Sequence, residues 1–169
     1  EVGDRLRTMS GVQAVTIAGA APMSASFTIG GLQAQGAPEP ERGATQFIHS
    51  NAILPDYFSV MGMRLAQGTT FTDTTVAAAQ VVVNETMAKQ LWPGQSPLGK
   101  RMRVVYMGQG EWKTVVGVAA NALNMGRTDR DNPMLYTPGR AYGDVIIARM
   151  SGDAATAVTA MTKLPRELD

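Results

Sequence analysis

Short runs of β-branched and apolar residues, separated by turn-forming glycines and prolines, predict that most of the chain folds as β-strands. The run Val12–Ile17 is the clearest, because it holds the residues that strands favour and follows Gly11 directly. Gly30 and Gly31 interrupt another run, and the turn Gly108–Gly110 joins two more. The predicted strands are 12–17, 27–35, 46–53, 63–66, 80–83, 100–106, 112–119, 134–136 and 144–150.

Apolar residues at helical spacing predict short helical pieces among the strands. Asn84 can cap one of them through its side-chain oxygen, and Pro93 ends it. Pro55 suits the first turn of another, and Gly62 stops it. The helical pieces are the end of a helix at 2–9, Asp56–Met61, the segment after Asn84, and a final helix capped by Asp153. These strands and the four helical pieces, mixed without a regular βαβα alternation and without a repeat, predict an α+β fold.

The composition is that of a folded globular protein with no charge bias. The chain has 169 residues, 44% hydrophobic and 17% charged, which excludes disorder and allows one domain or two small lobes. Its net charge is +1, and no basic block interrupts the even distribution of charge. Nucleic acid is therefore not an expected partner.

Two residue types narrow the possible chemistry. The absence of cysteine excludes disulfides, thiol nucleophiles and cysteine-based metal sites. The single histidine, His49, excludes a histidine-only metal site or a histidine-rich catalytic centre within one chain. The sequence contains no run of about 18 apolar residues, so no membrane span is predicted. It contains no signal peptide either. Both chain ends look cut, as in a fragment of a longer protein, with a processed mature protein as the alternative.

The segment Gly94–Lys100 matches the spacing of a phosphate-binding loop. Such a loop follows a strand and opens a helix, so that backbone N–H groups face the phosphates. Here a helix precedes the segment and a strand follows it, Pro97 lacks an N–H, and Arg101 stands where a magnesium-binding Ser or Thr is needed. A helix-to-strand turn with Lys100 on the surface is the favoured interpretation.

Three other signals have structural interpretations as well. Asp129–Asn132 resembles the start of a calcium loop but lacks its glycine and its final glutamate. His49 and Ser50 are neighbours in a strand and point to opposite faces, so they cannot form a catalytic pair. The chain has 11 methionines, and most of them are expected to fill the core. Those expected in the core are Met61, Met63, Met87 and Met102; those expected to be exposed are Met23, Met107 and Met125.

Four stretches in a fixed order carry a family resemblance. They are Gly11–Val15 followed by Pro22-Met23; Leu54–Leu65 leading to Gly68 and Phe71; Val82–Ala88 continuing through Leu91–Gly94 to Pro97–Met102; and Val115–Val118 with Pro133 and Tyr136. Together they resemble the MacB-like periplasmic core domain of FtsX-like ABC transporter permeases, most of all the large permeases of acidobacteria. One departure is Gly68-Thr69-Thr70-Phe71, where the family usually has an arginine after the glycine.

The resemblance implies an architecture and a location. It implies a two-lobed periplasmic core domain with mixed β-sheets and short helices. Residues 1–26 and 115–169 would form a membrane-proximal α/β lobe, and residues 27–114 an inserted mixed-β lobe. The domain would lie on the periplasmic side of the bacterial cytoplasmic membrane, between two transmembrane helices of its parent permease.

The resemblance also implies partners and a function. The partners would be the rest of the permease, its cytoplasmic ATPase, and a second permease copy or a periplasmic partner protein. The domain would hold no catalytic residue, metal or cofactor, and would couple ATP-driven motion to the handling of substrate or partner. Two other functions stay open: a domain that binds a ligand or lipoprotein between its lobes, and an enzyme of unknown type.

Overall fold

The computed structural model describes residues 2–22, 24, 27–41, 46–72, 77–122, 132–140 and 143–151. Within these residues the helices are α1 (Val2–Arg7), α2 (Tyr57–Met61), α3 (Glu85–Leu91) and the 3-10 turn η1 (Ala77–Ala79). The strands are β1 (Val12–Ala18), β2 (Phe27–Ala34), β3 (Gln46–Ile53), β4 (Leu65–Gly68), β5 (Gln80–Asn84), β6 (Arg101–Val105), β7 (Lys113–Ala119), β8 (Met134–Pro138) and β9 (Val145–Met150).

The nine strands form one mixed sheet, and part of it closes into a six-stranded barrel. Around the barrel the order is β2, β6, β7, β5, β8 and β3, and the pairing of β3 with β2 completes the ring. The contacts β5–β7 and β3–β8 are parallel, and the others in the ring are antiparallel. Because every ring strand has a neighbour on each side, the closed ring has no open strand edge.

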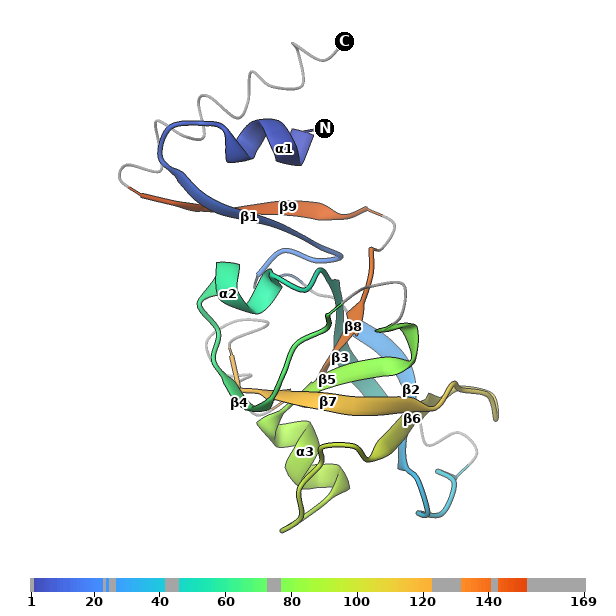
Figure 1. The fold of residues 1–169 in the computed structure, drawn as a ribbon. Coiled ribbons are helices and arrows are strands. Elements are labelled where there is room, and N and C mark those ends of the chain that lie inside the picture. Colours follow the sequence, from blue (N-terminus) through green and yellow to red (C-terminus); the bar gives the residue numbers. More distant parts are fainter. Residues whose placement is uncertain are drawn as a thin grey trace.

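Strands β1 and β9 leave the barrel and form a separate antiparallel pair. Figure 1 shows this pair beyond the barrel, with α1 against it and α2 between it and the barrel. This β1–β9 sheet joins the barrel through a single register pair, Ala18 of β1 with Ile53 of β3. The molecule therefore has a closed body and a two-stranded extension made of segments from opposite ends of the described chain.

Three apolar clusters follow this division. The barrel core fills the ring and reaches α3; its buried members are Ala34, Ile48, Val81, Val83, Met87, Ala88, Trp92, Met102, Val115, Val118 and Leu135. A second cluster, which we call the joint, holds the barrel against β1 and β9; its buried members are Ala18, Ile53, Tyr57, Phe58, Phe71, Val82, Ala119, Met134 and Tyr136. A third, small cluster places Leu6 of α1 on Val15 of β1.

The joint is aromatic at its centre. Phe58 of α2 lies edge-on to Tyr136 of β8, with ring centroids 4.9 Å apart, and Tyr57 lies 5.6 Å from Phe58. Burial raises the pKa of the Tyr57 and Tyr136 phenols above their ordinary value, so both stay protonated at neutral pH.

Two polar contacts fix the orientation of β1 against the rest of the joint. The hydroxyl of Thr16 donates to the Asp56 carboxylate at 2.6 Å. The buried amide of Asn51 accepts from the Ala20 N–H at 3.0 Å and donates to the Ala20 carbonyl at 3.2 Å. Because these groups are matched in pairs, the joint is specific in geometry as well as apolar.

Asn84, Gly62 and Pro93 bracket helices as predicted, whereas Pro55 lies just before the α2 N-cap, Asp56, and not in the first turn. Asn84 caps α3 by accepting from the Met87 N–H at 2.9 Å, and it also accepts from the Met134 N–H at 3.0 Å. Gly62 ends α2 with a φ of +67°, a conformation that favours glycine. A Cβ at this position would lie 2.5 Å from the guanidinium of Arg149, so the glycine also leaves room for the Arg149 side chain.

The structure confirms the predicted α+β class and most of the strand positions. Strand β4 begins two residues later than predicted. The final helix predicted after Asp153 lies outside the described residues. The predicted boundary between residues 114 and 115 falls inside β7, and β7 and β8 both belong to the barrel. The two-lobed arrangement itself stays a prediction.

Candidate ligand cavity in the barrel

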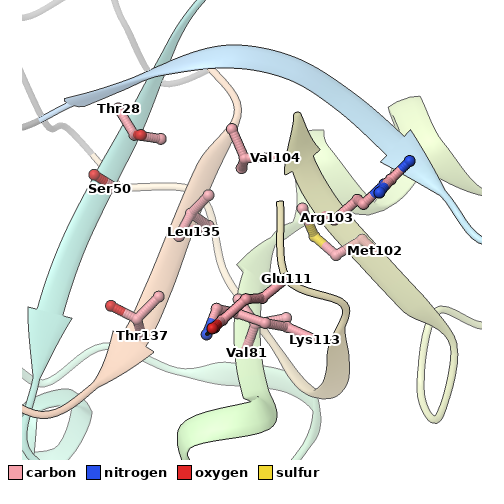
Figure 2. Close-up of a pocket in the computed structure, with 10 residues that line it drawn as sticks. All are labelled: Thr28, Ser50, Val81, Met102, Arg103, Val104, Glu111, Lys113, Leu135 and Thr137. Atoms are coloured by element: carbon pink, nitrogen blue, oxygen red, sulfur yellow. Dashed lines mark ion pairs between the residues drawn. The ribbon is translucent and has the colours of Figure 1, made fainter. Parts of the chain in front are cut away.

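A cavity of about 300 Å³ opens between the barrel strands. All six ring strands contribute to its wall, so it exists only because the ring is closed. Figure 2 shows the residues that line it: Thr28, Ser50, Val81, Met102, Arg103, Val104, Glu111, Lys113, Leu135 and Thr137.

The floor of the cavity is apolar because alternate residues of each strand face the barrel interior. Val81, Met102 and Leu135 are buried members of the barrel core, and each is at most 5% exposed. The hydroxyl-bearing residues Ser50 and Thr137 stand two residues along from inward-facing apolar positions, so they lie on the same interior face. The cavity thus combines an apolar floor with hydroxyl groups.

A single ion pair supplies the charge at the wall. Lys113 Nζ donates to the Ala78 carbonyl at 2.8 Å and lies 3.7 Å from the Glu111 carboxylate. The Lys113 side chain is 28% exposed and the Glu111 side chain 90% exposed, so Glu111 is the more solvated partner of this pair. An ammonium has three N–H donors, so one that already has a carbonyl and a carboxylate partner can still donate a hydrogen bond to a ligand.

The guanidinium of Arg103 is directed elsewhere, although the residue lines the cavity. Its Nε donates to Gln33 at 2.7 Å, another nitrogen lies 3.5 Å from Glu39, and the group stacks 4.9 Å from the ring centroid of Trp112. Figure 2 shows the side chain running away from the floor of the cavity. Lys113 is therefore the basic group that a ligand in the cavity would meet.

The chemistry of this wall suits binding rather than bond making. A cavity of this size lies at the lower limit of small-molecule sites, which span about 300–1,000 Å³. Its hydroxyls have no base within a catalytic hydrogen bond among the contacts of the described residues, and the Lys113 ammonium pairs with a carboxylate. The arrangement fits a small ligand with an apolar body and a polar or anionic end.

His49 and Ser50 lie on opposite faces of β3, as predicted. Ser50 lines the cavity, whereas His49 Nε2 is 3.2 Å from the Asn132 side-chain amide outside it. The backbone carbonyl of Asn132 also accepts a hydrogen bond from the Asn84 side-chain amide at 2.8 Å. His49 thus belongs to the polar contacts around the α3 cap.

The segment Gly94–Lys100 is a helix-to-strand turn between α3 and β6, as predicted. Lys100 is half-buried, and its ammonium contacts Gln95 within the same turn. No group of three His, Asp or Glu side chains that could hold a metal occurs in the described part of the chain. Most of the segment that resembles the start of a calcium loop, residues 129–131, lies outside it.

The methionines are placed as expected wherever they are described. Met87 and Met102 are buried, and Met61 and Met63 pack against the joint. Met107 is 85% exposed at the turn between β6 and β7. Met23 and Met125 lie outside the described residues.

Sequence reasoning did not find the cavity. Its hydroxyl residues, such as Ser50 and Thr137, look like ordinary strand residues until the parallel pairing of β3 with β8 places Ser50 beside Leu135 and Thr137 beside Ala52. A small polar residue at an inward position of an apolar strand is the only signal, and its meaning depends on strand pairing.

No helix in the described part of the chain is long and apolar enough to span a membrane. Comparison with known proteins then identifies the class. The model of the MacB-like periplasmic core domain matches residues 2–165. The chain belongs to this family, and it is the periplasmic or extracellular region of a MacB/FtsX-type ABC transporter permease. The family is generally not catalytic.

Solved structures share the fold. The periplasmic region of MacB from Actinobacillus actinomycetemcomitans matches with a TM-score of 0.66 and 21% identity, over 99% of this chain and 72% of that one. The extracellular domain of the noncanonic ABC-type transporter YknZ from Gram-positive bacteria matches with a TM-score of 0.58 and 20% identity, over 94% and 75% of the two chains. A domain assigned to a permease from Porphyromonas gingivalis matches with a TM-score of 0.65 and 13% identity, over 98% and 75%. No curated protein matches in sequence.

Proposed function

We propose that this domain is a non-catalytic module that couples ATP-driven conformational change to the handling of a substrate or partner. A separate cytoplasmic component of the transporter would hydrolyse ATP. The observation that carries the proposal is the division into a closed barrel and the β1–β9 sheet, which meet at one register pair and at the joint.

The joint has the features of a surface along which two bodies can shift. Its apolar contacts are not directional, whereas the hydrogen bonds of Thr16 and Asn51 favour one arrangement. Movement of the sheet would break few strand hydrogen bonds, because β1 and β3 pair only between Ala18 and Ile53. The two-lobed arrangement is thus proposed with β1 and β9 on the membrane side and the ring strands in the other lobe.

A crosslink across the joint tests this proposal in the intact permease. The chain has no cysteine, so the pair Thr16→Cys and Asp56→Cys would be unique in this domain. Their side chains touch in the structure, which suits a disulfide or a short crosslinker. We expect crosslinking to lower transport or ATPase stimulation at least tenfold, with recovery on reduction.

The matched control is a crosslink within one body. Arg101 and Thr114 are register partners on β6 and β7, and a crosslink between cysteines there should leave transport unchanged. Full activity with the joint quantitatively crosslinked would contradict the coupling function.

The barrel cavity favours a second candidate function, the binding of a small ligand. A ligand with an apolar body and an anionic end would place the body against Val81 and Leu135 and the anion near Lys113. Octanoate is a suitable probe, with octylamine as the charge-reversed control. Octanoate should raise the melting temperature of the chain and lose this effect in Ser50→Trp, which fills the cavity; equal effects of the two probes would exclude the site.

Three further predictions remain part of the proposal. The partners are the rest of the permease with its ATPase, and a second permease copy or a periplasmic partner protein. The parent is of the large type found in acidobacteria. A ligand or lipoprotein held between the lobes is the alternative use of the domain.

A further inference from the structure

The two edges of β1 differ in their pairing. One edge pairs with β9 from Val12 with Met150 to Ala18 with Val145, with a β-bulge between Val12 and Ala14. The other edge pairs with β3 only at Ala18. From Val12 to Ile17, no strand of the described residues lies along this second edge.

The backbone groups at this edge can be assigned from the contacts at its end. The Leu54 N–H donates to the Ile17 carbonyl at 3.3 Å, and the Gly19 N–H donates to the Ala52 carbonyl at 2.8 Å. The backbone N–H and carbonyl groups of residues 17 and 19 therefore point away from β9. Since backbone groups alternate between the two sides of an antiparallel strand, the N–H and carbonyl of Val15 face the same way.

A groove of about 370 Å³ runs beside this edge. Four consecutive β1 residues form one side, Arg7 of α1 forms an end wall, and α2 forms the opposite wall. The lining residues are Arg7, Val12, Gln13, Ala14, Val15, Asp56, Ser59 and Val60. The unpaired edge is thus exposed inside a slot between α1 and α2.

Arg7 already occupies the position of a missing strand partner. Its guanidinium donates to the Val15 carbonyl at 3.5 Å, the outer limit of a hydrogen bond. The same group pairs with Asp4 at 2.8 Å, and the side chain is 48% exposed. The backbone N–H of an incoming strand could replace this long contact with a normal hydrogen bond at little cost, because Arg7 keeps its partner Asp4.

We propose that this groove binds an extended peptide segment of a partner protein, which adds a third strand beside β1. Main-chain hydrogen bonds to an open strand edge supply affinity in this mode of recognition, and alternate side chains supply specificity. One face of the added strand would meet Val60 and Ser59 of α2, and the other would lie near Arg7. Alternating β-branched side chains suit both faces.

The β1 edge is recessed between α1 and α2, which favours a single extended segment over a second copy of this chain as the partner. A second copy of this chain would have to offer its own β1 edge, which lies between its own α1 and α2 in the same way. Two recessed edges cannot approach to the strand spacing of about 4.8 Å. A single extended segment is slim enough to enter the groove, so a flexible segment of another protein is the occupant.

This inference deepens the proposed function by naming the kind of partner that the membrane-side sheet would hold. Its test needs only the isolated chain, without the ATPase or the membrane. Loss of peptide binding would leave the crosslinking result untouched, and a failed crosslinking result would leave peptide binding untouched.

The probe is a small library of capped hexapeptides in which valine alternates with threonine, serine, lysine or glutamate. Binding is followed by NMR through the backbone amides of Val15 and Ile17, which face the open edge. We expect at least one peptide to shift these amides in a saturable way, and the Val15 amide to become protected from hydrogen exchange.

Two controls make the result specific. The same peptide N-methylated at alternate backbone nitrogens keeps its side chains but cannot pair with a strand edge, and its affinity should fall at least tenfold. In the protein, Ser59→Trp fills the groove from an exposed position on α2 and should weaken binding equally. Lys89→Trp, on the exposed side of α3, should bind like the native chain.

Three results would overturn the proposal. The first is equal binding of the N-methylated and the unmodified peptide. The second is undiminished peptide binding by a Ser59→Trp variant whose amide spectrum is native. The third is that no library peptide at about 2 mM shifts these amides, since this concentration detects binding as weak as about −4 kcal/mol.

Discussion

The barrel and the β1–β9 sheet use the same kind of short strand but treat their edges in opposite ways. In the barrel, the pairing of β2 with β3 closes the ring, and the apolar side chains share one enclosed core. In the β1–β9 sheet, no described residue pairs with one edge of β1 for most of its length, and the buried members that the described residues give to its own apolar cluster are Leu6 and Val15.

This difference assigns the two regions different roles. A closed ring has no edge to offer and holds its shape through its own core. A two-stranded sheet is marginal alone and depends on packing against other elements. The sheet of this domain depends on the joint, so changes in the joint should release the sheet while leaving the barrel intact.

The largest effect is expected from Phe58→Ala in the joint. Phe58 is 3% exposed and contacts Tyr57 and Tyr136, so its truncation should destabilise the chain by about 3–5 kcal/mol. Urea unfolding measures the total loss. Hydrogen exchange should show that amides of β1 and β9 lose protection before those of β5 and β7; uniform loss would mean that the two regions are one cooperative unit.

A smaller loss is expected from Asn84→Ala, which acts on the barrel side. The change removes the α3 cap, worth about 1 kcal/mol, and leaves the Met134 N–H without its partner, which costs about 1–3 kcal/mol. The expected total is about 2–4 kcal/mol by urea unfolding. Protection should fall in β5 and β8 first, and a loss confined to β1 and β9 would contradict the division.

Alkaline pH should loosen the joint by way of its two buried phenols. Burial raises the pKa of Tyr57 and Tyr136 in the folded chain, so above about pH 10 the unfolded chain loses phenolic protons that the folded chain keeps. The contribution of the two phenols to stability is therefore constant below this pH and falls above it, by up to about 1.4 kcal/mol per pH unit for each phenol. Tyr136→Phe should make the decline shallower in denaturation series from pH 9 to 12; an unchanged slope would contradict the assignment.

The smallest effect is expected at the turn between β6 and β7. Met107 is 85% exposed and has a φ of +51°, a conformation that asparagine tolerates better than methionine. Met107→Asn should change stability by no more than about 0.5 kcal/mol. Urea unfolding measures the change, and a large loss would reveal a structural role that exposure does not show.

Local sequence patterns predicted the helices and strands but not how the strands pair. Asn84 and Gly62 bracket helices through contacts within a few residues, and both predictions are confirmed. The ring depends on contacts such as His49 with Met134, which are distant in sequence and have no local pattern. The residues that line the cavity are recognisable only after the ring closes, and the same holds for the open edge of β1, since it is defined by the absence of a neighbour.

The position of β8 in the ring has a consequence for how the chain acquires its structure. β8 lies between β3 and β5, and it is the last of the ring strands along the sequence. During synthesis the earlier strands can form hairpins, but the ring stays open until residues 134–138 arrive. Pairing across such long separations makes folding slow and leaves unpaired strand edges exposed in the meantime. The domain should therefore need protection from aggregation until β8 is delivered, and it should fold after its translocation rather than during it.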